Sequence, residues 1–295
     1  MLSSCTLCPR ECSVNRTAGE TGFCGLDNRI KVARMALHHW EEPCVSGTKG
    51  SGTVFFSGCN MKCIYCQNYD ISRNCKGRFI TEEELAQSFL SLQNEGAHNI
   101  NLVTPTHYVP NIKKALDMAR LDGLKIPAIY NCGGYEKQET IESLNGYIDI
   151  YMPDIKYFSD KYAVEYSMAD GYFEYAKKAL CEMVSQVGEP VLDENGIMQK
   201  GVIVRHLMLP SLLFETKKII DYLASEYKDS IYISLMSQYT PMPSVSSHSR
   251  LNRRINVRHY EAMTEYIELL GLKNVYIQDI TSAQDDFIPE FYGND

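Results

Sequence analysis

The chain has 295 residues, 44% of them hydrophobic, with 11 cysteines and a formal net charge of -8 at pH 7. This length suits one large α/β barrel or two ordinary domains with a hydrophobic core. The acidic balance, with no basic cluster beyond RLNRR (250–254), argues against a nucleic-acid partner. No apolar run approaches the roughly 20 residues of a membrane helix, and MLSSCTLCPR lacks the apolar core of a secretory signal. We therefore expect a cytoplasmic protein without a membrane partner.

The first 50 residues contain a tight group of cysteines. Cys5, Cys8, Cys12 and Cys24 form a C-x2-C-x3-C-x11-C array, and four thiolates make a complete metal shell. The array predicts a second metal site, either zinc or an iron-sulfur cluster, with free thiols or a redox disulfide as the alternative. Because SGTKGSG (46–52) is typical of a flexible joint, we expect residues 1–50 to form a small separate module.

From residue 51 to residue 295 the chain alternates β-branched runs with amphipathic helical stretches, which is typical of βα units around a parallel sheet. The runs that predict strands are 53–58, 99–104, 126–131, 147–154, 201–209, 231–238 and 274–279. The stretches that predict helices are 81–96, 110–123, 139–146, 172–188 and 258–271. The sequence thus predicts an α/β fold, an open, partial parallel βα barrel of about six βα units and a last strand, rather than a closed barrel.

A second cysteine group follows the first predicted strand of this barrel. Cys59, Cys63 and Cys66 are spaced C-x3-C-x2-C, in a place where parallel barrels gather reactive groups. Three thiolates can bind three irons of a four-iron four-sulfur (4Fe-4S) cluster and leave the fourth iron open to another ligand. A zinc knuckle that takes a distant fourth ligand, or three buried thiols, would be the alternatives.

This loop resembles that of the radical S-adenosylmethionine (SAM) superfamily. Segments such as GSGTVFFSGCNMKCIYCQN, GAHNINLVTPTHYVP and YMPDIKY further resemble the family similar to pyruvate formate-lyase activating enzyme. The resemblance implies that SAM occupies the open iron and that its reductive cleavage yields a radical that abstracts hydrogen. It also implies that Tyr65 lies beside the adenine and that an electron donor such as flavodoxin or ferredoxin supplies the electron.

The second predicted strand ends in a departure from that family. Activating enzymes have Gly-Gly-Glu there to hold the amino group of SAM, whereas this chain has VTPTHY. Thr104, Thr106 and His107 are candidate replacements as hydrogen-bond partners, although they lack a carboxylate to pair with an ammonium group. The resemblance therefore predicts that SAM is held differently in detail.

Other candidate cofactor-binding residues follow later strands. Asp154 and Lys156, in PDIK, resemble the Asp-x-Lys of activating enzymes and are candidates near the cofactor or substrate, with a solvated ion pair as the alternative. Arg205 and Gln238 follow the fifth and sixth strands toward the same rim, where polar residues serve an active site or cap a loop.

The sequence thus favours a radical SAM enzyme, and the first target to consider is a glycine of a partner enzyme. Another peptide, protein or small molecule is the alternative target. From other classes, we considered a non-catalytic iron-sulfur electron carrier and a zinc hydrolase, but the sequence contains no H-E-x-x-H motif. The polar insertion TPMPSVSSHSRLNRR (240–254) is either a lid or docking surface, or a solvated loop.

Overall fold

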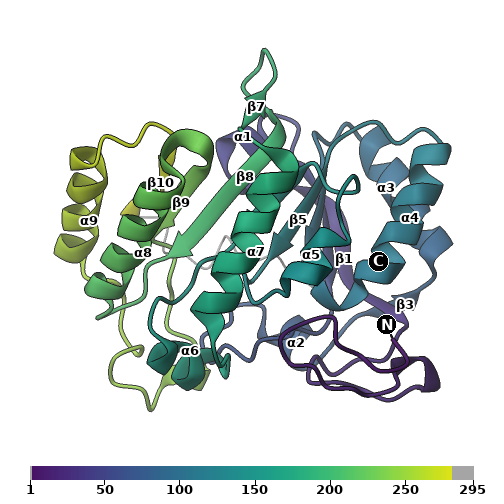
Figure 1. The fold of residues 1–295 in the computed structure, drawn as a ribbon, viewed down its shortest axis with the longest axis horizontal. Coiled ribbons are helices and arrows are strands. Elements are labelled where there is room, and N and C mark those ends of the chain that lie inside the picture. Colours follow the sequence, from purple (N-terminus) through teal and green to yellow (C-terminus); the bar gives the residue numbers. More distant parts are fainter. Residues whose placement is uncertain (1, 281–295) are drawn as a thin grey trace.

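The computed structural model describes residues 2–280, so residues 281–295 of the predicted barrel lie outside the described residues. Its centre is a 10-stranded sheet in the order β10-β9-β8-β6-β5-β4-β2-β1-β3, with β7 paired to β8 (Figure 1). The parallel strands are β2 (Ser51–Phe56), β4 (Ile100–Val103), β5 (Ala128–Cys132), β6 (Ile150–Pro153), β8 (Met198–Leu207), β9 (Tyr232–Met236) and β10 (Val275–Ile277). They match the seven predicted strands in number and order. The sheet stays open, which confirms the partial barrel.

The sequence does not predict the antiparallel edge of the sheet. β1 (Ile30–His38) pairs antiparallel with β2, and β3 (Arg78–Ile80) pairs antiparallel with β1. Residues 30–38 therefore belong to the main sheet, in contrast to the separate module predicted over residues 1–50. β1 covers the backbone edge of β2, which would otherwise present unpaired N–H and C=O groups. We call the remaining N-terminal part, residues 2–29, the N-terminal cysteine segment.

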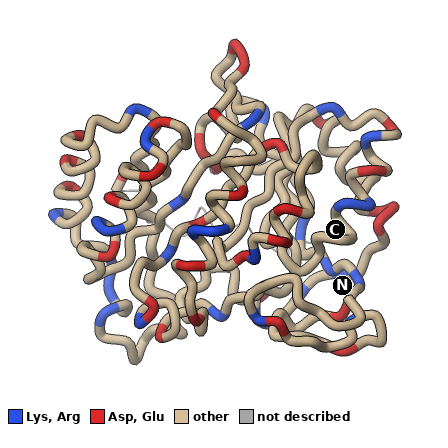
Figure 2. The backbone as a smooth tube through the Cα atoms, in the orientation of Figure 1, with Lys and Arg blue, Asp and Glu red and all other residues tan. Residues whose placement is uncertain are grey.

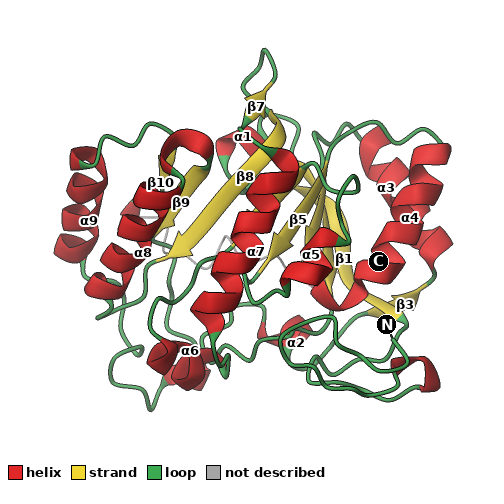
Figure 3. Cartoon of the chain, in the orientation of Figure 1, coloured by secondary structure: helices red, strands yellow, loops and turns green. Residues whose placement is uncertain are grey.

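Helices connect the strands, and the longer ones line up along one face of the sheet (Figures 1 and 3). The helices are α1 (Pro43–Ser46), α2 (Tyr69–Ser72), α3 (Glu82–Asn94), α4 (Val109–Leu121), α5 (Gln138–Glu142), α6 (Asp160–Ser167), α7 (Tyr172–Val187), α8 (Leu213–Glu226) and α9 (Val257–Leu269). Local sequence explains their ends. Thr81 caps α3 in a capping box with Glu84, and Pro110 lies in the first turn of α4.

The central parallel strands β2, β4, β5 and β6 are almost wholly buried, and the carboxyl ends of the parallel strands point to one edge of the sheet. The cysteine loop, α2, α6 and the N-terminal cysteine segment gather at this edge, at the bottom of Figure 1. Contacts between distant residues attach the N-terminal cysteine segment there. The carbonyl oxygen of Leu7 accepts a hydrogen bond from Thr140 Oγ1 at 2.7 Å, and Glu11 pairs with Lys137 at 2.6 Å.

A buried carboxyl group, Glu136, lies behind the same edge with 0% exposure. Its Oε1 accepts a hydrogen bond from Thr106 Oγ1 at 2.7 Å, and its Oε2 accepts one from Tyr130 OH at 3.1 Å. Burial raises the pKa of Glu136 from 4.5 to about 7, and these hydrogen bonds offset only part of that rise.

Basic and acidic residues are interspersed along the chain (Figure 2). Within the described residues, none of the helices combines the length and the apolar character required to cross a bilayer.

Replacement of Thr81 by Ala should lower the free energy of unfolding by about 1 kcal/mol, because the backbone N–H of Glu84 loses its capping acceptor. Urea denaturation measures the change. Ser91→Ala on the exposed side of the same helix is the matched control and should change stability by less than about 0.5 kcal/mol. Equal effects of the two substitutions would contradict the capping role.

Glu136 should make stability depend on pH. Its pKa is higher in the folded protein, so its contribution is fully present below pH 4.5 and is lost as the pH rises to about 7. The loss amounts to about 3 kcal/mol. Glu136→Gln has no such titration, so it should gain stability relative to wild type between pH 5 and pH 8 in urea unfolding. Parallel pH profiles for the two proteins would refute the buried titration.

Candidate functional site

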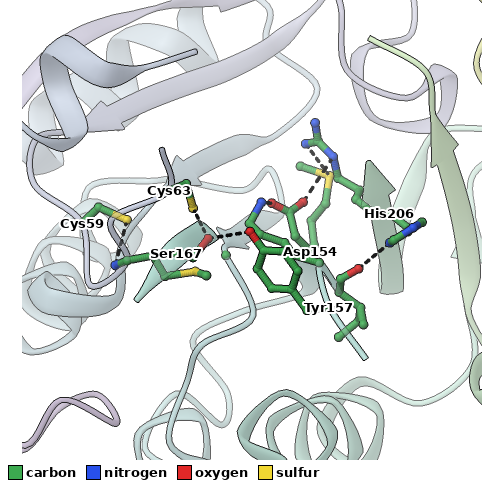
Figure 4. A network of polar contacts seen from close by, with 12 residues as sticks. Cys59, Cys63, Asp154, Tyr157, Ser167 and His206 are labelled. Atoms are coloured by element: carbon green, nitrogen blue, oxygen red, sulfur yellow. Dashed lines mark hydrogen bonds and ion pairs between the residues drawn. The ribbon is translucent and has the colours of Figure 1, made fainter. Parts of the chain in front are cut away.

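A cavity of about 230 Å³ opens at the carboxyl ends of the parallel strands. It brings together eight of the predicted site residues, from the cysteine loop and from the ends of four strands. These residues are Cys59, Cys63, Cys66, Thr104, Asp154, Lys156, Arg205 and Gln238. Parallel strands place their following loops at one edge, so residues far apart in sequence meet there (Figure 4).

The cysteine loop directs hydrogen-bond donors at its sulfur atoms. The backbone N–H of Met61 donates to Cys59 Sγ at 3.3 Å, and the N–H of Asn68 donates to the Cys66 sulfur. Cys66 Sγ also forms a hydrogen bond with Ser72 Oγ at 3.3 Å. In the first two bonds the donor lies two residues after the cysteine. Such bonds stabilise a sulfur atom that carries negative charge, as a metal-bound thiolate does.

Cys63 begins a buried chain of hydroxyl groups, drawn in Figure 4. Ser167 Oγ donates to Cys63 Sγ at 3.0 Å and lies 2.6 Å from Tyr157 OH. Tyr157 OH lies 2.6 Å from Tyr65 OH. Tyr65, which belongs to the cysteine loop, thus contacts Tyr157 in the interior and does not line the cavity.

The three thiols are close enough to influence one another. Burial raises the pKa of Cys59 and of Cys66, and the charge of Cys63 raises both further. Lys156 opposes this rise at both sulfurs. A metal or cluster that binds such thiols displaces their protons and leaves thiolates opposite a cation.

Buried charges of both signs border the cavity. Arg205 on β8 lies 3.0 Å from Glu41, 3.5 Å from Glu42 and 3.9 Å from Asp154, which follows β6. Asp154 also pairs with Lys156 at 2.5 Å. Burial alone would lower the pKa of Arg205 and of Lys156, but the neighbouring carboxylates outweigh it and raise both. Both side chains therefore remain cations.

The residues of VTPTHY divide between the cavity and the interior. Thr104 lines the cavity with φ 59°, a left-handed conformation that is unusual for a β-branched residue. Thr106 turns inward to Glu136, and His107 Nε2 lies 2.8 Å from the carbonyl oxygen of Ser57. Burial, and then the charge of Arg16, lower the pKa of His107 to about 3, so the ring is neutral. Thr106 and His107 thus do not line the cavity.

Sequence reasoning missed several cavity residues. Asn131 and Cys132 end β5, and their position after a predicted strand was an available signal. Glu41 and Trp40 also line the cavity, but they reach it only because β1 joins the sheet. Nothing in the spacing of the sequence indicates that placement.

The insertion 240–254 packs against the cysteine loop. Ser244 Oγ donates a hydrogen bond to the carbonyl oxygen of Ile64, which lies between Cys63 and Cys66. Beside it, Gln67 Nε2 donates to the carbonyl oxygen of Gln238 at 3.2 Å. One side of the cavity is therefore held by the loop that follows β9.

The four N-terminal cysteines are free thiols. Burial raises the pKa of Cys24, and the charges of Cys5 and Cys12 raise it further. Burial also raises the pKa of Cys8 to about 12, and the charges of Cys24 and Cys12 add to that rise. Within residues 2–280, no three Cys, His, Asp or Glu side chains converge as a single metal ion requires. This finding applies to both cysteine groups.

The donor set of the cavity fits a 4Fe-4S cluster with SAM. It offers three thiols with sulfur-directed N–H groups, leaves one iron without a protein thiol from the loop, and places charges of both signs alongside.

A comparison with models of protein families points the same way. The model of the radical SAM superfamily matches residues 53–188. The uncharacterized protein MJ0674 of Methanocaldococcus jannaschii is 30% identical over 289 residues, which cover 94% of this chain and 78% of that protein. The uncharacterized protein MJ0808 of the same organism is 27% identical over 227 residues, which cover 70% of this chain and 61% of that protein.

Solved structures share the fold. Streptococcus suis SuiB bound to precursor peptide SuiA has a TM-score of 0.51 and 14% identity, covering 76% of this chain and 48% of SuiB. The FeFe-hydrogenase maturase HydG from Carboxydothermus hydrogenoformans has a TM-score of 0.52 and 14% identity, covering 78% of this chain and 54% of HydG. The chain thus spans about half the length of these proteins. The match to the superfamily model shows a radical SAM superfamily domain over residues 53–188, and the solved structures add the shared fold.

Proposed function

We propose that this chain reductively cleaves SAM at a 4Fe-4S cluster and abstracts hydrogen from a target. The observation that carries the proposal is the convergence of the Cys59, Cys63 and Cys66 thiols with the Asp154–Lys156 pair on one cavity. The cluster and SAM supply, when bound, the electron transfer to the sulfonium and the radical that results. The protein supplies the ligands, the orientation and the charges.

Each group of the cavity has a proposed role. The three thiols would hold the cluster. Asp154 offers a carboxylate for an ammonium group, and Lys156 offers an ammonium for a carboxylate, which are the two charged ends of an amino acid. This pair supplies the carboxylate that Thr104 lacks. Arg205 would hold Asp154 in position from the opposite side.

A peptide or protein is the target class that we propose. Trp40 lines the cavity and is 65% exposed, so it offers an aromatic surface at the mouth. SuiB, which shares the fold, has been solved with a precursor peptide. A glycine of a partner enzyme, as the resemblance to activating enzymes implies, is one such target, and a small molecule is the alternative. A flavodoxin or ferredoxin would supply the electron.

The first test is the formation of 5'-deoxyadenosine. Protein reconstituted with iron and sulfide without oxygen, then given dithionite and SAM, should form this product. Cys63→Ala should reduce it to background because one iron loses its ligand. Cys181→Ala, on the exposed side of α7, is the matched control and should retain full formation.

Product that persists in Cys63→Ala would refute the assignment of the cluster ligands. Absence of product in wild type, despite a full complement of reducible cluster, would refute cleavage by the chain alone. The assay repeated with candidate peptides would then test whether cleavage requires the target.

Lys156→Met should weaken SAM binding by about 10- to 100-fold, because a charge-assisted hydrogen bond contributes about 1.5–3 kcal/mol. Equilibrium dialysis with the reconstituted protein measures the Kd. Lys156→Arg should retain most of the affinity, and Lys178→Met, at an exposed position of α7, should leave it unchanged. An unaltered Kd in Lys156→Met would exclude Lys156 from the cofactor site.

A further inference from the structure

Arg16 is a charged side chain that the N-terminal cysteine segment buries completely, with 0% exposure. Its Nη1 donates to the carbonyl oxygen of His107 at 2.7 Å, and its Nε donates to that of Asp27 at 3.1 Å. Nη1 also lies 3.9 Å from Cys5 Sγ. Among the described residues, no carboxylate lies within 4.0 Å of this guanidinium, and that of Asp27 pairs with Arg29 instead.

A cation buried without an anion is costly, so proteins pair buried charges or bind them to a charged group. The carbonyl groups around Arg16 supply dipoles but no negative charge. The groups near it that can carry charge are the Asp27 carboxylate, which also pairs with Arg29, and two sulfur atoms, namely Cys5 in contact and Cys24, on whose pKa the positive charge acts. These cysteines become anions when a metal displaces their protons.

The backbone already directs donors at the neighbouring sulfurs. The N–H of Phe23 donates to Cys12 Sγ at 3.2 Å, and the N–H of Arg10 donates to the Cys8 sulfur. In the second bond the donor follows the cysteine by two residues. The same spacing occurs at Cys59 and Cys66, in the loop of the superfamily cluster. The N-terminal cysteine segment therefore has the local geometry of a thiolate site.

The arrangement favours a cluster over a single ion. Zinc would draw all four sulfurs to about 2.3 Å from one point. The described side chains do not converge in this way, at the N-terminal cysteines or at Cys59, Cys63 and Cys66. An iron-sulfur cluster binds each thiolate through a separate iron and so accepts sulfurs that are farther apart.

We propose that Cys5, Cys8, Cys12 and Cys24 bind a second iron-sulfur cluster as four thiolates, with Arg16 as its buried counter-cation. Four protein ligands leave no iron open, so this cluster does not bind SAM. The site is separate from the cavity, and its test requires neither SAM nor turnover.

The test uses the full chain with Cys59, Cys63 and Cys66 all replaced by Ala, which leaves the N-terminal cysteine segment intact. After reconstitution and removal of excess metal, this variant should retain about four irons and four sulfides per chain, against about eight of each in wild type. Mössbauer spectra should show a four-iron cluster. A variant without bound iron, or one with a single zinc that iron does not replace, would overturn the proposal.

Two further substitutions in the same triple variant test Arg16. Arg16→Met removes a positive charge beside the cluster and should shift its reduction potential to a more negative value, since net charge helps to set that potential. Arg16→Lys should keep most of the wild-type potential, and Lys178→Gln, at an exposed position of α7, should leave it unchanged. Equal potentials for Arg16→Met and Arg16→Lys would refute the counter-cation role.

Discussion

The contact on which the candidate site depends is the buried ion pairing of Arg205. This guanidinium on β8 lies between Glu41 and Glu42, which precede α1, and Asp154, which follows β6. It thereby connects the antiparallel edge of the sheet to its centre. A buried carboxylate without this partner would be costly, so Arg205 offsets part of the cost of burying Glu41 and holds the cavity wall in place.

The cysteine loop is held from several sides, which suits a loop that has to present three sulfurs at fixed positions. Ser167 from α6 contacts Cys63, and Ser244 from the insertion contacts Ile64. Arg10 from the N-terminal cysteine segment donates to the carbonyl oxygen of Asn60 at 2.9 Å. Because these contacts come from separate parts of the chain, the loop is preorganised by the whole fold and not by its own sequence alone.

The parallel strands could be predicted from the sequence, whereas β1 and the cavity residues that depend on it could not, for physical reasons. The parallel strands were predicted because burial on both faces produces continuous β-branched runs. β1 was missed because its burial alternates only at Ile30 and Val32, and most of its residues are half-buried. The charged wall depends on β1, so the roles of Glu41 and Glu42 were missed with it.

The candidate site residues likewise divide into those whose position the sequence predicts and those whose position it does not. Asp154, Lys156 and Arg205, which the sequence offered as candidates at strand ends, line the cavity because the register of parallel strands brings their ends to one edge. The turn after β4 could not be predicted in the same way. There Thr104 adopts φ 59° and the next residues form a 3-10 helix (Thr106–Tyr108), so Thr106 and His107 turn inward. A left-handed β-branched residue has a backbone cost of about 1–3 kcal/mol, which the surrounding structure offsets.

The attachment of the N-terminal cysteine segment has a consequence for the order in which the chain folds. Leu7 is held by Thr140, 133 residues later, and Arg16 by His107, 91 residues later. During synthesis the first cysteines leave the ribosome well before these partners exist, because domains emerge from the N-terminus onward. The segment must therefore wait, with its thiols exposed, until β4 and β5 are in place. Closing such long loops is entropically costly, so docking of the segment belongs to the late stages of folding.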